Sequence, residues 1–295
     1  MSAMRTVPDA IERPPYVLGD RPGQAGPQRH RGEALDRLRV ACRIAAEVLD
    51  ETAAAVAPGV TTDELDLIAH DAYLRRGAYP STLGYKGYTK SVCTSVNEVV
   101  CHGIPDSRPL RDGDIVNIDV TAYIGGVHGD TSATVLVGDV DEPTRALVDT
   151  TRDATLLAIA AIRPDDDLSV IGETIQPFAH GRGFGVVRDY GGHGIGAVFH
   201  AVPHVNHIIE RAPAFPLTPG TTFTIEPMLT AGTELHHQWD DDWTVVTNDL
   251  LPSAQFEHTV IVTEEGAEIL TLTADGRSRA GSLTDLAAPI ASPVT

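Results

Sequence analysis

An α+β fold made of two similar halves is predicted, each half with a pair of helices followed by antiparallel strands. Apolar residues recur at helical spacing in two pairs of segments, and after each pair the pattern changes to the alternation typical of strands. Pro58 and Pro164 interrupt the two pairs at corresponding points, as do Gly77 and Gly183, and both separations are 106 residues. The repeat is weak evidence by itself, because two such matches can arise by chance.

The helices are predicted from apolar spacing and from their end signals. Over residues 33–57 apolar side chains recur every three or four positions, and a Pro-Gly pair then ends the pattern. The second helix is predicted to begin at a threonine cap, Thr61 or Thr62, and to end at Gly77. The corresponding helices of the second half are expected to pass through residues 156–162 and 168–180.

The strands are predicted from alternation and turn residues. Residues 115–123 and 127–137 flank Gly125-Gly126, a pair typical of a two-residue hairpin turn. Further strands are expected at residues 222–226, 243–247 and 254–262.

Both ends of the chain are expected to lie outside the folded domain, which would span residues 33–273. Residues 1–32 are rich in Pro, Gly and Arg and lack apolar periodicity, which predicts an extended or disordered N-terminal extension. A solvated tail is the simpler interpretation, and docking on the domain or on a partner is the alternative. Residues 274–295 are expected to form a frayed C-terminal tail.

Composition excludes several classes of protein. The 295 residues are 42% apolar, enough for one large or two small well-buried domains. The net charge of −19, with only two lysines, argues against nucleic-acid binding and is compatible with metal ions or cationic partners. Three cysteines without a CxxC pair favour a reducing cytosol. Neither an export signal nor a membrane-spanning stretch is visible, so a cytoplasmic protein without a membrane partner is expected.

Two carboxylates are predicted to meet on the hairpin. If Gly125 and Gly126 are the turn, Thr121 lies opposite Asp130, and Asp119 is then a diagonal neighbour of Asp130 on one face. Diagonal neighbours lie roughly 7–8 Å apart, within reach of one cation or two adjacent ones. The alternative, that the pair lies on a solvated face, is equally open from the hairpin alone.

Other acidic and imidazole groups favour a metal site. Glu226 and Glu257 lie in strand-like segments, and His193 lies in a glycine-rich segment seven residues before His200. Each is more often structural when taken singly. Four carboxylates and one imidazole together suit Mn, Fe(II) or Co, with Zn also compatible. Two such metals about 3.5–4 Å apart would activate a shared water for amide hydrolysis.

Other chemistries fit the sequence less well. The glycine-rich segment 181–185 matches neither a dinucleotide fingerprint nor a P-loop, and no G-x-S-x-G motif is present. Cys101-His102 could suggest a thiol nucleophile, but neighbouring side chains of a strand are expected to point to opposite faces.

Six ordered segments carry recognisable motifs: residues 91–105, 112–120, 128–131, 192–196, 224–228 and 254–259. Together they resemble the type I methionine aminopeptidases, and the match spans about residues 35–272. The resemblance implies the pita-bread fold, an antiparallel sheet flanked by two helix pairs related by a pseudo-two-fold axis. That axis would explain the 106-residue repeat.

The resemblance also implies a dinuclear metal centre. Its two divalent ions, of Co, Mn, Fe or Zn, would be held by Asp119, Asp130, His193, Glu226 and Glu257, with Asp130 and Glu257 bridging. The metal loaded in the cell does not follow from the sequence.

The implied activity is removal of the initiator methionine from nascent chains whose second residue is small. A bridging hydroxide would attack the carbonyl while Glu226 shuttles a proton to the leaving amine. His102 resembles the histidine that contacts the substrate backbone, and His200 the one that polarises the scissile carbonyl. The residues implied for the methionine pocket are Tyr85, Tyr88, Cys93, His102, Phe199 and Trp243.

Some features depart from the commonest family pattern. Lys86 stands where many members have histidine, and Thr89 where many have proline, which affects the pocket rim. Residues 235–242 are expected to form a variable hairpin, either a solvated loop or a stray metal site. The N-terminal extension lacks a cysteine-rich zinc finger, which favours a bacterial-type enzyme and leaves ribosome association as one role for this arm. A proline peptidase and a non-catalytic binding protein remain as alternative functions.

Overall fold

The computed structural model describes residues 2–20, 25–211 and 213–286. Its long helices are α1 (Glu33–Ala53), α2 (Thr62–Arg75), α3 (Glu142–Ala161) and α4 (Val170–His180), and its short 3₁₀ helices are η1 (Pro15–Leu18), η2 (Tyr85–Gly87) and η3 (Leu283–Asp285). The strands are β1 (Tyr79–Pro80), β2 (Cys93–Val96), β3 (Val99–Cys101), β4 (Ile115–Ile124), β5 (Val127–Leu136), β6 (Gly185–Val186), β7 (Gly192–Gly194), β8 (Ala201–Val205), β9 (Thr222–Ile225), β10 (Met228–Thr230), β11 (His236–Gln238), β12 (Val245–Thr247), β13 (Ser253–Val262) and β14 (Ala267–Ile269).

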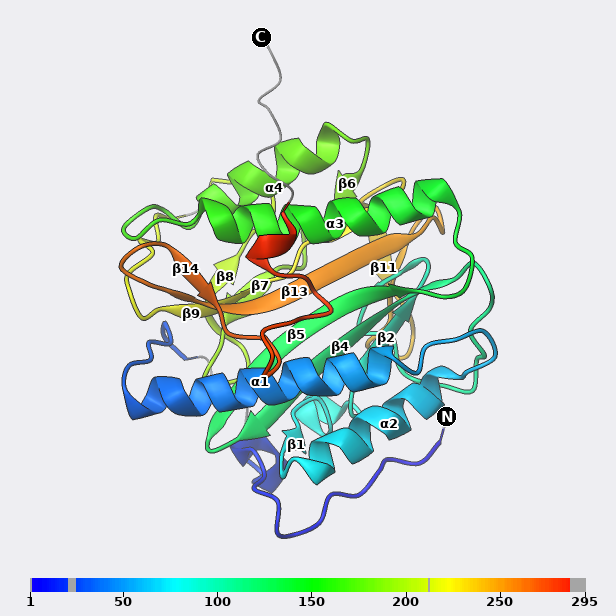
Figure 1. The fold of residues 1–295 in the computed structure, drawn as a ribbon. Helices are drawn as coiled ribbons and strands as arrows, with labels where there is room; N and C mark the ends of the chain where they lie inside the picture. The colour runs from blue at the N-terminus through cyan, green and yellow to red at the C-terminus, as the bar shows by residue number, and fades with distance from the viewer. Residues whose placement is uncertain (1, 21–24, 212, 287–295) are drawn as a thin grey trace.

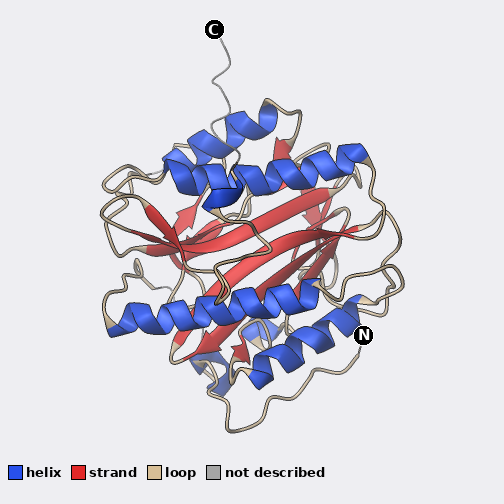
Figure 2. Cartoon of the chain, viewed as in Figure 1, coloured by secondary structure: helices blue, strands red, loops and turns tan. Residues whose placement is uncertain are grey.

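Two helix pairs cover one antiparallel sheet, as the α+β prediction requires (Figures 1 and 2). The main path of the sheet is β1-β4-β5-β13-β9-β7-β8, with shorter strands paired beside it. Helix α1 packs on β4 and β5, and α2 packs on α1. Helix α3 packs on β13, and α4 packs on α3. This arrangement of two similar halves is the pita-bread fold, and the predicted fold class is confirmed.

One continuous core joins the two halves. Buried side chains from the first half, such as Leu49 and Ile118, belong to the same cluster as Leu147, Phe223 and Val260 from the second. The described residues therefore form a single folded unit and not two small domains. None of the described helices is long and apolar enough to cross a membrane.

The helices follow the predicted end signals at some points and differ at others. Thr61 caps α2 in a capping box, because its side chain accepts from the Glu64 N–H while the Glu64 carboxylate accepts from the Thr61 N–H. Helix α1 ends at Ala53, four residues earlier than predicted. Helix α3 begins at Glu142, well before the predicted segment, because Asp141 caps it by accepting from the Thr144 N–H.

The β4–β5 hairpin has the predicted register. Gly125 and Gly126 have φ of 61° and 78°, values that a two-residue turn of this type needs at both positions. Thr121 lies opposite Asp130, and Asp119 lies opposite Ser132. The hairpin interpretation of the sequence is therefore confirmed. The later strands are confirmed with small shifts: β9 ends at Ile225, β12 begins at Val245, and β13 begins at Ser253.

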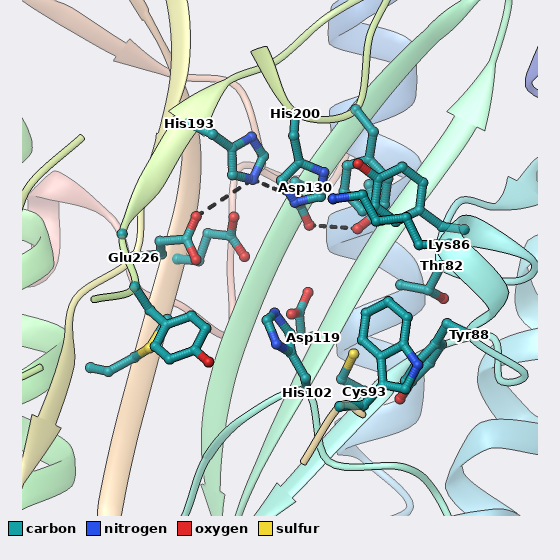
Figure 3. A pocket seen from close by; sticks show the side chains of 18 of the residues that line it. Thr82, Lys86, Tyr88, Cys93, His102, Asp119, Asp130, His193, His200 and Glu226 are labelled. Carbon is teal, nitrogen blue, oxygen red and sulfur yellow. Dashed lines mark hydrogen bonds and ion pairs between the residues drawn. The ribbon is translucent and has the colours of Figure 1, made fainter. Parts of the chain in front are cut away.

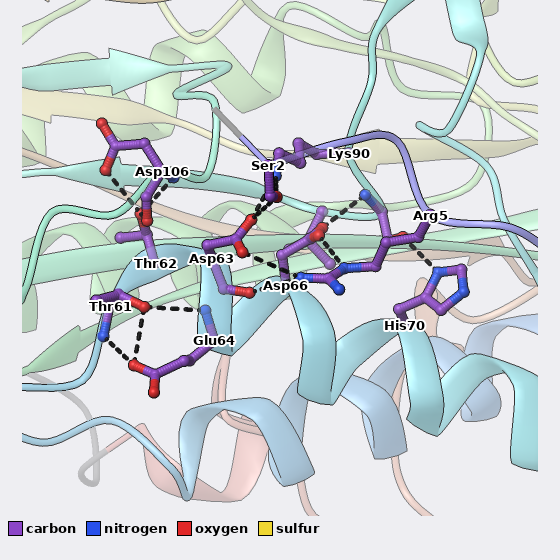
Figure 4. Close-up of polar contacts among 12 residues, drawn as sticks. Ser2, Arg5, Thr61, Thr62, Asp63, Glu64, Asp66, His70, Lys90 and Asp106 are labelled. Carbon is purple, nitrogen blue, oxygen red and sulfur yellow. Dashed lines mark hydrogen bonds and ion pairs between the residues drawn. The ribbon is translucent and has the colours of Figure 1, made fainter.

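The described part of the N-terminal extension lies against the domain (Figure 4). The Arg5 guanidinium donates to Asp66 Oδ2 at 2.7 Å, and Asp66 also accepts from the Ser91 N–H at 2.7 Å. Lys90, whose side chain is fully buried, donates to Ser2 Oγ and pairs with Asp63. The extension is thus docked, the alternative to the solvated tail.

We expect Arg5→Ala to lower the free energy of unfolding by about 1–3 kcal/mol, because it leaves the fully buried Asp66 carboxylate without its cation. Each kcal/mol corresponds to a fall in melting temperature of about 2–4 °C, which thermal unfolding monitored by circular dichroism would detect. Arg13→Ala is the matched control, since its partner Asp9 is fully exposed. Equal melting temperatures for the two variants would show that the docked arm adds no stability.

One point of the C-terminal segment packs on the domain. Ala280 is fully buried, and the ring of His258 lies 3.0 Å from the carbonyl oxygen of Gly281. The prediction of a frayed tail is therefore wrong at Ala280 and Gly281, where a Cβ on Gly281 would meet Leu156 and Arg152 of α3. Residues 287–295 lie outside the described residues.

Candidate active site

All the predicted site residues line one pocket of about 240 Å³ (Figure 3). The central strands supply the carboxylates: Asp119 comes from β4, Asp130 from β5 and Glu257 from β13, while Glu226 follows β9 directly. Segments far apart in the sequence therefore meet because the sheet places their strands side by side.

The acidic residues and His193 form a compact cluster. Asp130, His193 and Glu257 each offer one ligand atom within 4.8 Å of the others, the only such group among the described residues. His193 Nε2 lies 3.7 Å from Asp130 Oδ2 and 3.6 Å from Glu226 Oε1. Asp119 points into the same space from the neighbouring strand (Figure 3).

Glycines let the strand that carries His193 approach its neighbours. A Cβ on Gly192 would lie 2.1 Å from the carbonyl oxygen of Thr224, and one on Gly194 would lie 2.2 Å from that of Val202. Only glycine fits such contacts, so β7 can place the imidazole beside Glu226.

Hydrogen bonds from neutral groups orient the carboxylates. Thr121 Oγ1 donates to Asp130 Oδ1 at 2.7 Å. Thr224 Oγ1 donates to Glu226 Oε1 at 2.7 Å, and Gln255 Nε2 donates to Glu226 Oε2 at 3.2 Å. None of these donors carries a charge, so they fix geometry without neutralising the cluster.

The electrostatics of the cluster favour a bound cation. Desolvation in the pocket raises the pKa of Asp119 to about 7, and desolvation together with repulsion from Asp119 raises the pKa of Glu226 to about 8. Desolvation and the other carboxylates raise the pKa values of Asp130 and Glu257 well above the usual range. Burial lowers the pKa of His193 to about 4, which leaves a neutral imidazole suited to metal ligation. The oxygen-rich donor set therefore fits hard divalent ions.

A wall of aromatic rings and one thiol borders the cluster. Cys93 lies opposite Asp119 on the adjacent strand, and the rings of Tyr88 and Trp243 meet edge to face at 4.9 Å. The Tyr88 hydroxyl lies 3.1 Å from the carbonyl oxygen of Val92 and 3.0 Å from that of Gly103, so its ring is held in place. Burial raises the pKa of the Cys93 thiol well above its usual value. This wall consists of aromatic rings and a polarisable sulfur, and it lies next to the carboxylates.

Two histidines lie on opposite sides of the cluster (Figure 3). The His200 ring centroid lies 4.2 Å from that of His193, and the ring stacks on Tyr85 at 5.2 Å. Desolvation by the pocket walls and the neighbouring histidines lower the pKa of His200. Burial likewise lowers the pKa of His102 to about 4. Both rings are therefore neutral at pH 7 and can donate a hydrogen bond without adding charge.

The geometry assumed for Cys101 and His102 is wrong. His102 has a φ of 58°, so the two side chains do not alternate, and Cys101 Sγ lies 3.7 Å from His102 Nδ1. Burial nevertheless raises the pKa of the Cys101 thiol well above its usual value, and Cys101 does not line the pocket. A thiol nucleophile remains disfavoured, for a different reason.

Several residues that line the pocket were not predicted from the sequence, including Thr82, Tyr190 and Met228. The ring of Tyr190 meets that of His102 at 5.7 Å. Tyr190 lies three residues before His193 and Met228 two residues after Glu226, so nearness to a predicted ligand is the signal that could have identified them.

Residues 235–242 form part of a hairpin, as predicted, with β11 paired to β12. His236 Nε2 lies 3.4 Å from Asp189 Oδ2, and His237 Nδ1 lies 2.7 Å from Asn248 Oδ1. Within the described ranges these histidines join no cluster of metal-ligating groups.

Comparisons with known proteins identify the family. Residues 36–264 match metallopeptidase family M24. The chain is 56% identical over 273 residues to methionine aminopeptidase 2 of Mycobacterium tuberculosis, covering 92% of this chain and 95% of that protein. The structure superposes on methionine aminopeptidase from Rickettsia prowazekii with a TM-score of 0.81 and 44% identity, covering 83% of this chain and all of that one.

A more distant likeness concerns the fold alone. Prolidase from Pyrococcus furiosus matches with a TM-score of 0.66 at 21% identity, over 83% of this chain and 65% of that one. The much higher identity to methionine aminopeptidases distinguishes between the two groups. The chain belongs to metallopeptidase family M24, whose members use divalent metal ions, and within it to the methionine aminopeptidases.

Proposed function

We propose that this protein is a metal-dependent aminopeptidase that removes the N-terminal methionine from polypeptides whose second residue is small. The observation that carries the proposal is the position of the apolar wall: Tyr88, Cys93 and Trp243 lie directly beside the carboxylate cluster. A flexible thioether packs well against aromatic rings and sulfur. A methionine side chain held there would place its own carbonyl at the cluster.

In this proposal two divalent ions would be held by Asp119, Asp130, His193, Glu226 and Glu257. Their raised pKa values fit this role, because unpaired carboxylates this close repel one another until a cation is bound. The ions, of Mn, Fe(II), Co or Zn, would lower the pKa of a water molecule and polarise the scissile carbonyl.

Three side chains of the pocket would handle the substrate and its proton. Glu226, held by Thr224 and Gln255, takes a proton from the attacking water and passes it to the leaving amine. His200 donates to the carbonyl oxygen as negative charge develops on it. His102, on the other side of the cluster, contacts the backbone of the substrate.

The proposed setting is the cytoplasm, with nascent chains as substrates. The three cysteines are free and buried, which fits a reducing compartment. Contact between the N-terminal arm and a ribosome stays a prediction. The restriction to small second residues is supported by the similarity to methionine aminopeptidases.

We expect removal of metal to abolish activity without unfolding the chain. Protein dialysed against a chelator should not cleave Met-Ala-Ser, and Mn or Co should restore cleavage, because the pocket carboxylates alone cannot polarise the carbonyl. Product release measured by mass spectrometry, with circular dichroism for the fold, checks both parts. Full activity in the chelated protein, with metal content confirmed as absent, would overturn the proposed function.

A further inference from the structure

A second cavity opens directly outside the active-site pocket. This outer groove has a volume of about 820 Å³. It shares four lining residues with the pocket: Lys86, His102, Tyr190 and Trp243. The two spaces are therefore adjacent, and a peptide whose first residue fills the pocket would leave it on the side of this groove.

The N-terminal arm forms one wall of the outer groove. Ser2 and Met4 line it, although they are far in the sequence from the rest of the groove. The arm is fixed there by buried contacts, because Lys90 donates to Ser2 Oγ at 2.5 Å and Arg5 is paired with Asp66 (Figure 4). The Met4 side chain is left 56% exposed, so the arm holds an apolar group at the groove.

Another part of the lining is acidic. It comes from the end of β11 and the loop that follows it, which contribute Gln238, Asp241 and Asp242. The carboxylate of Asp241 is engaged locally, since it accepts from the N–H groups of Trp243 and Thr244 at 2.9 and 2.8 Å. Asp242 is exposed and has a φ of 65°, in the left-handed region that Asp and Asn tolerate best. Asp242 is therefore the carboxylate free to meet a charged ligand.

We propose that the outer groove binds the third to fifth residues of the substrate, with Met4 packing on their side chains and Asp242 favouring a basic residue. The inference rests on the proposed function and deepens it, because it names what the enzyme selects beyond the second residue. The second residue lies next to the scissile bond, and because an extended chain advances about 3.3 Å per residue, the residues after it are the ones that extend outward into the groove.

The charge preference is tested by substituting Asp242. The parent enzyme should cleave Met-Ala-Ser-Arg-Arg-Gly with a kcat/KM about two- to fivefold above that for Met-Ala-Ser-Glu-Glu-Gly, as expected for an exposed ion pair. Asp242→Asn keeps the backbone preference and removes the charge, so the ratio should fall towards one. Asp240→Asn, at an exposed site outside the groove, is the matched control and should keep the parent ratio. An unchanged ratio in Asp242→Asn would overturn the charge preference.

The role of the arm is tested by Met4→Ala. The kcat/KM for Met-Ala-Ser-Leu-Leu-Gly, divided by that for Met-Ala-Ser, should fall in this variant through a higher KM for the longer peptide. Leu18→Ala is the matched control, because Leu18 is 72% exposed on the same arm but does not line the groove. If Met4→Ala and Leu18→Ala gave the same ratio of the two kcat/KM values, the proposed contact between the arm and the substrate would be wrong. Failure of the parent to cleave Met-Ala-Ser would instead contradict the proposed function, and the groove would lose its substrate with it.

Discussion

Glu226→Gln is expected to abolish hydrolysis of Met-Ala-Ser while the chain stays folded. The amide cannot accept a proton from water, and it replaces a proposed metal ligand with a neutral group. Loss of the proton shuttle alone should cost about 10²–10⁴ in kcat. The fold should persist, because burial already disfavours the ionised form of Glu226 and raises its pKa to about 8, and glutamine carries no charge. Steady-state kinetics with Mn- or Co-loaded protein, together with thermal unfolding, measures both quantities.

Glu234→Gln is the matched control for this experiment. Glu234 makes a long, half-exposed ion pair with Arg188 and lies outside the pocket, so the same chemical change there should leave kcat unaltered. A Glu226→Gln enzyme with the kcat of the parent would remove Glu226 from the proton transfer. Loss of activity in both variants would point to a general effect on the protein.

His200→Ala is expected to lower kcat more than tenfold with a smaller change in KM. The ring is held between His193, Phe199 and Tyr85, so its donor is oriented before the substrate arrives. A hydrogen bond that forms fully only as charge develops on the carbonyl oxygen typically contributes about 10²–10³ to kcat. Steady-state kinetics on Met-Ala-Ser separates kcat from KM.

Two further variants sharpen the test of His200. His200→Gln keeps an uncharged donor and should recover part of the lost kcat. His237→Ala removes an exposed histidine that contacts Asn248, and it should match the parent. An unchanged kcat in His200→Ala would exclude the residue from stabilising the transition state, whatever its effect on binding.

The central hairpin shows what could be predicted from sequence. Two glycines and regular alternation on both sides determine its register, and the register determines that Asp119 and Asp130 share a face. Whether that face was buried could not be decided locally. Burial depends on β13, which pairs with β5 from more than a hundred residues away, and on β9, which pairs with the other edge of β13.

The start of α3 was missed although its signal is present. Asp141 is followed by Glu142 and Pro143, a typical helix N-terminus, but the first turns are polar on most faces and the apolar spacing becomes clear only near Leu156. The short strands were missed for another reason. Strands of two or three residues such as β6 and β7 are too short to show a period.

Single residues decide how the arm docks and where the His102 ring lies relative to Cys101. Arg5 docks the arm through an ion pair with the buried Asp66, and Lys90 docks it through a hydrogen bond to Ser2, and no apolar pattern in the sequence reports such contacts. At His102 a left-handed backbone breaks the alternation expected of a regular strand, so the Cys101 and His102 side chains lie closer together than that rule predicts. Local departures of this kind are common at functional sites.

The pocket is proposed to hydrolyse the peptide bond after an N-terminal methionine. This proposal is tested most directly by offering Met-Ala-Ser, Met-Leu-Ser and Ala-Pro-Ser together to the Mn- or Co-loaded protein and identifying the products by mass spectrometry. We predict loss of methionine from Met-Ala-Ser alone. Cleavage of Ala-Pro-Ser instead would identify a proline peptidase, and no cleavage with metal bound would show a binding protein on this fold; either result would contradict the account.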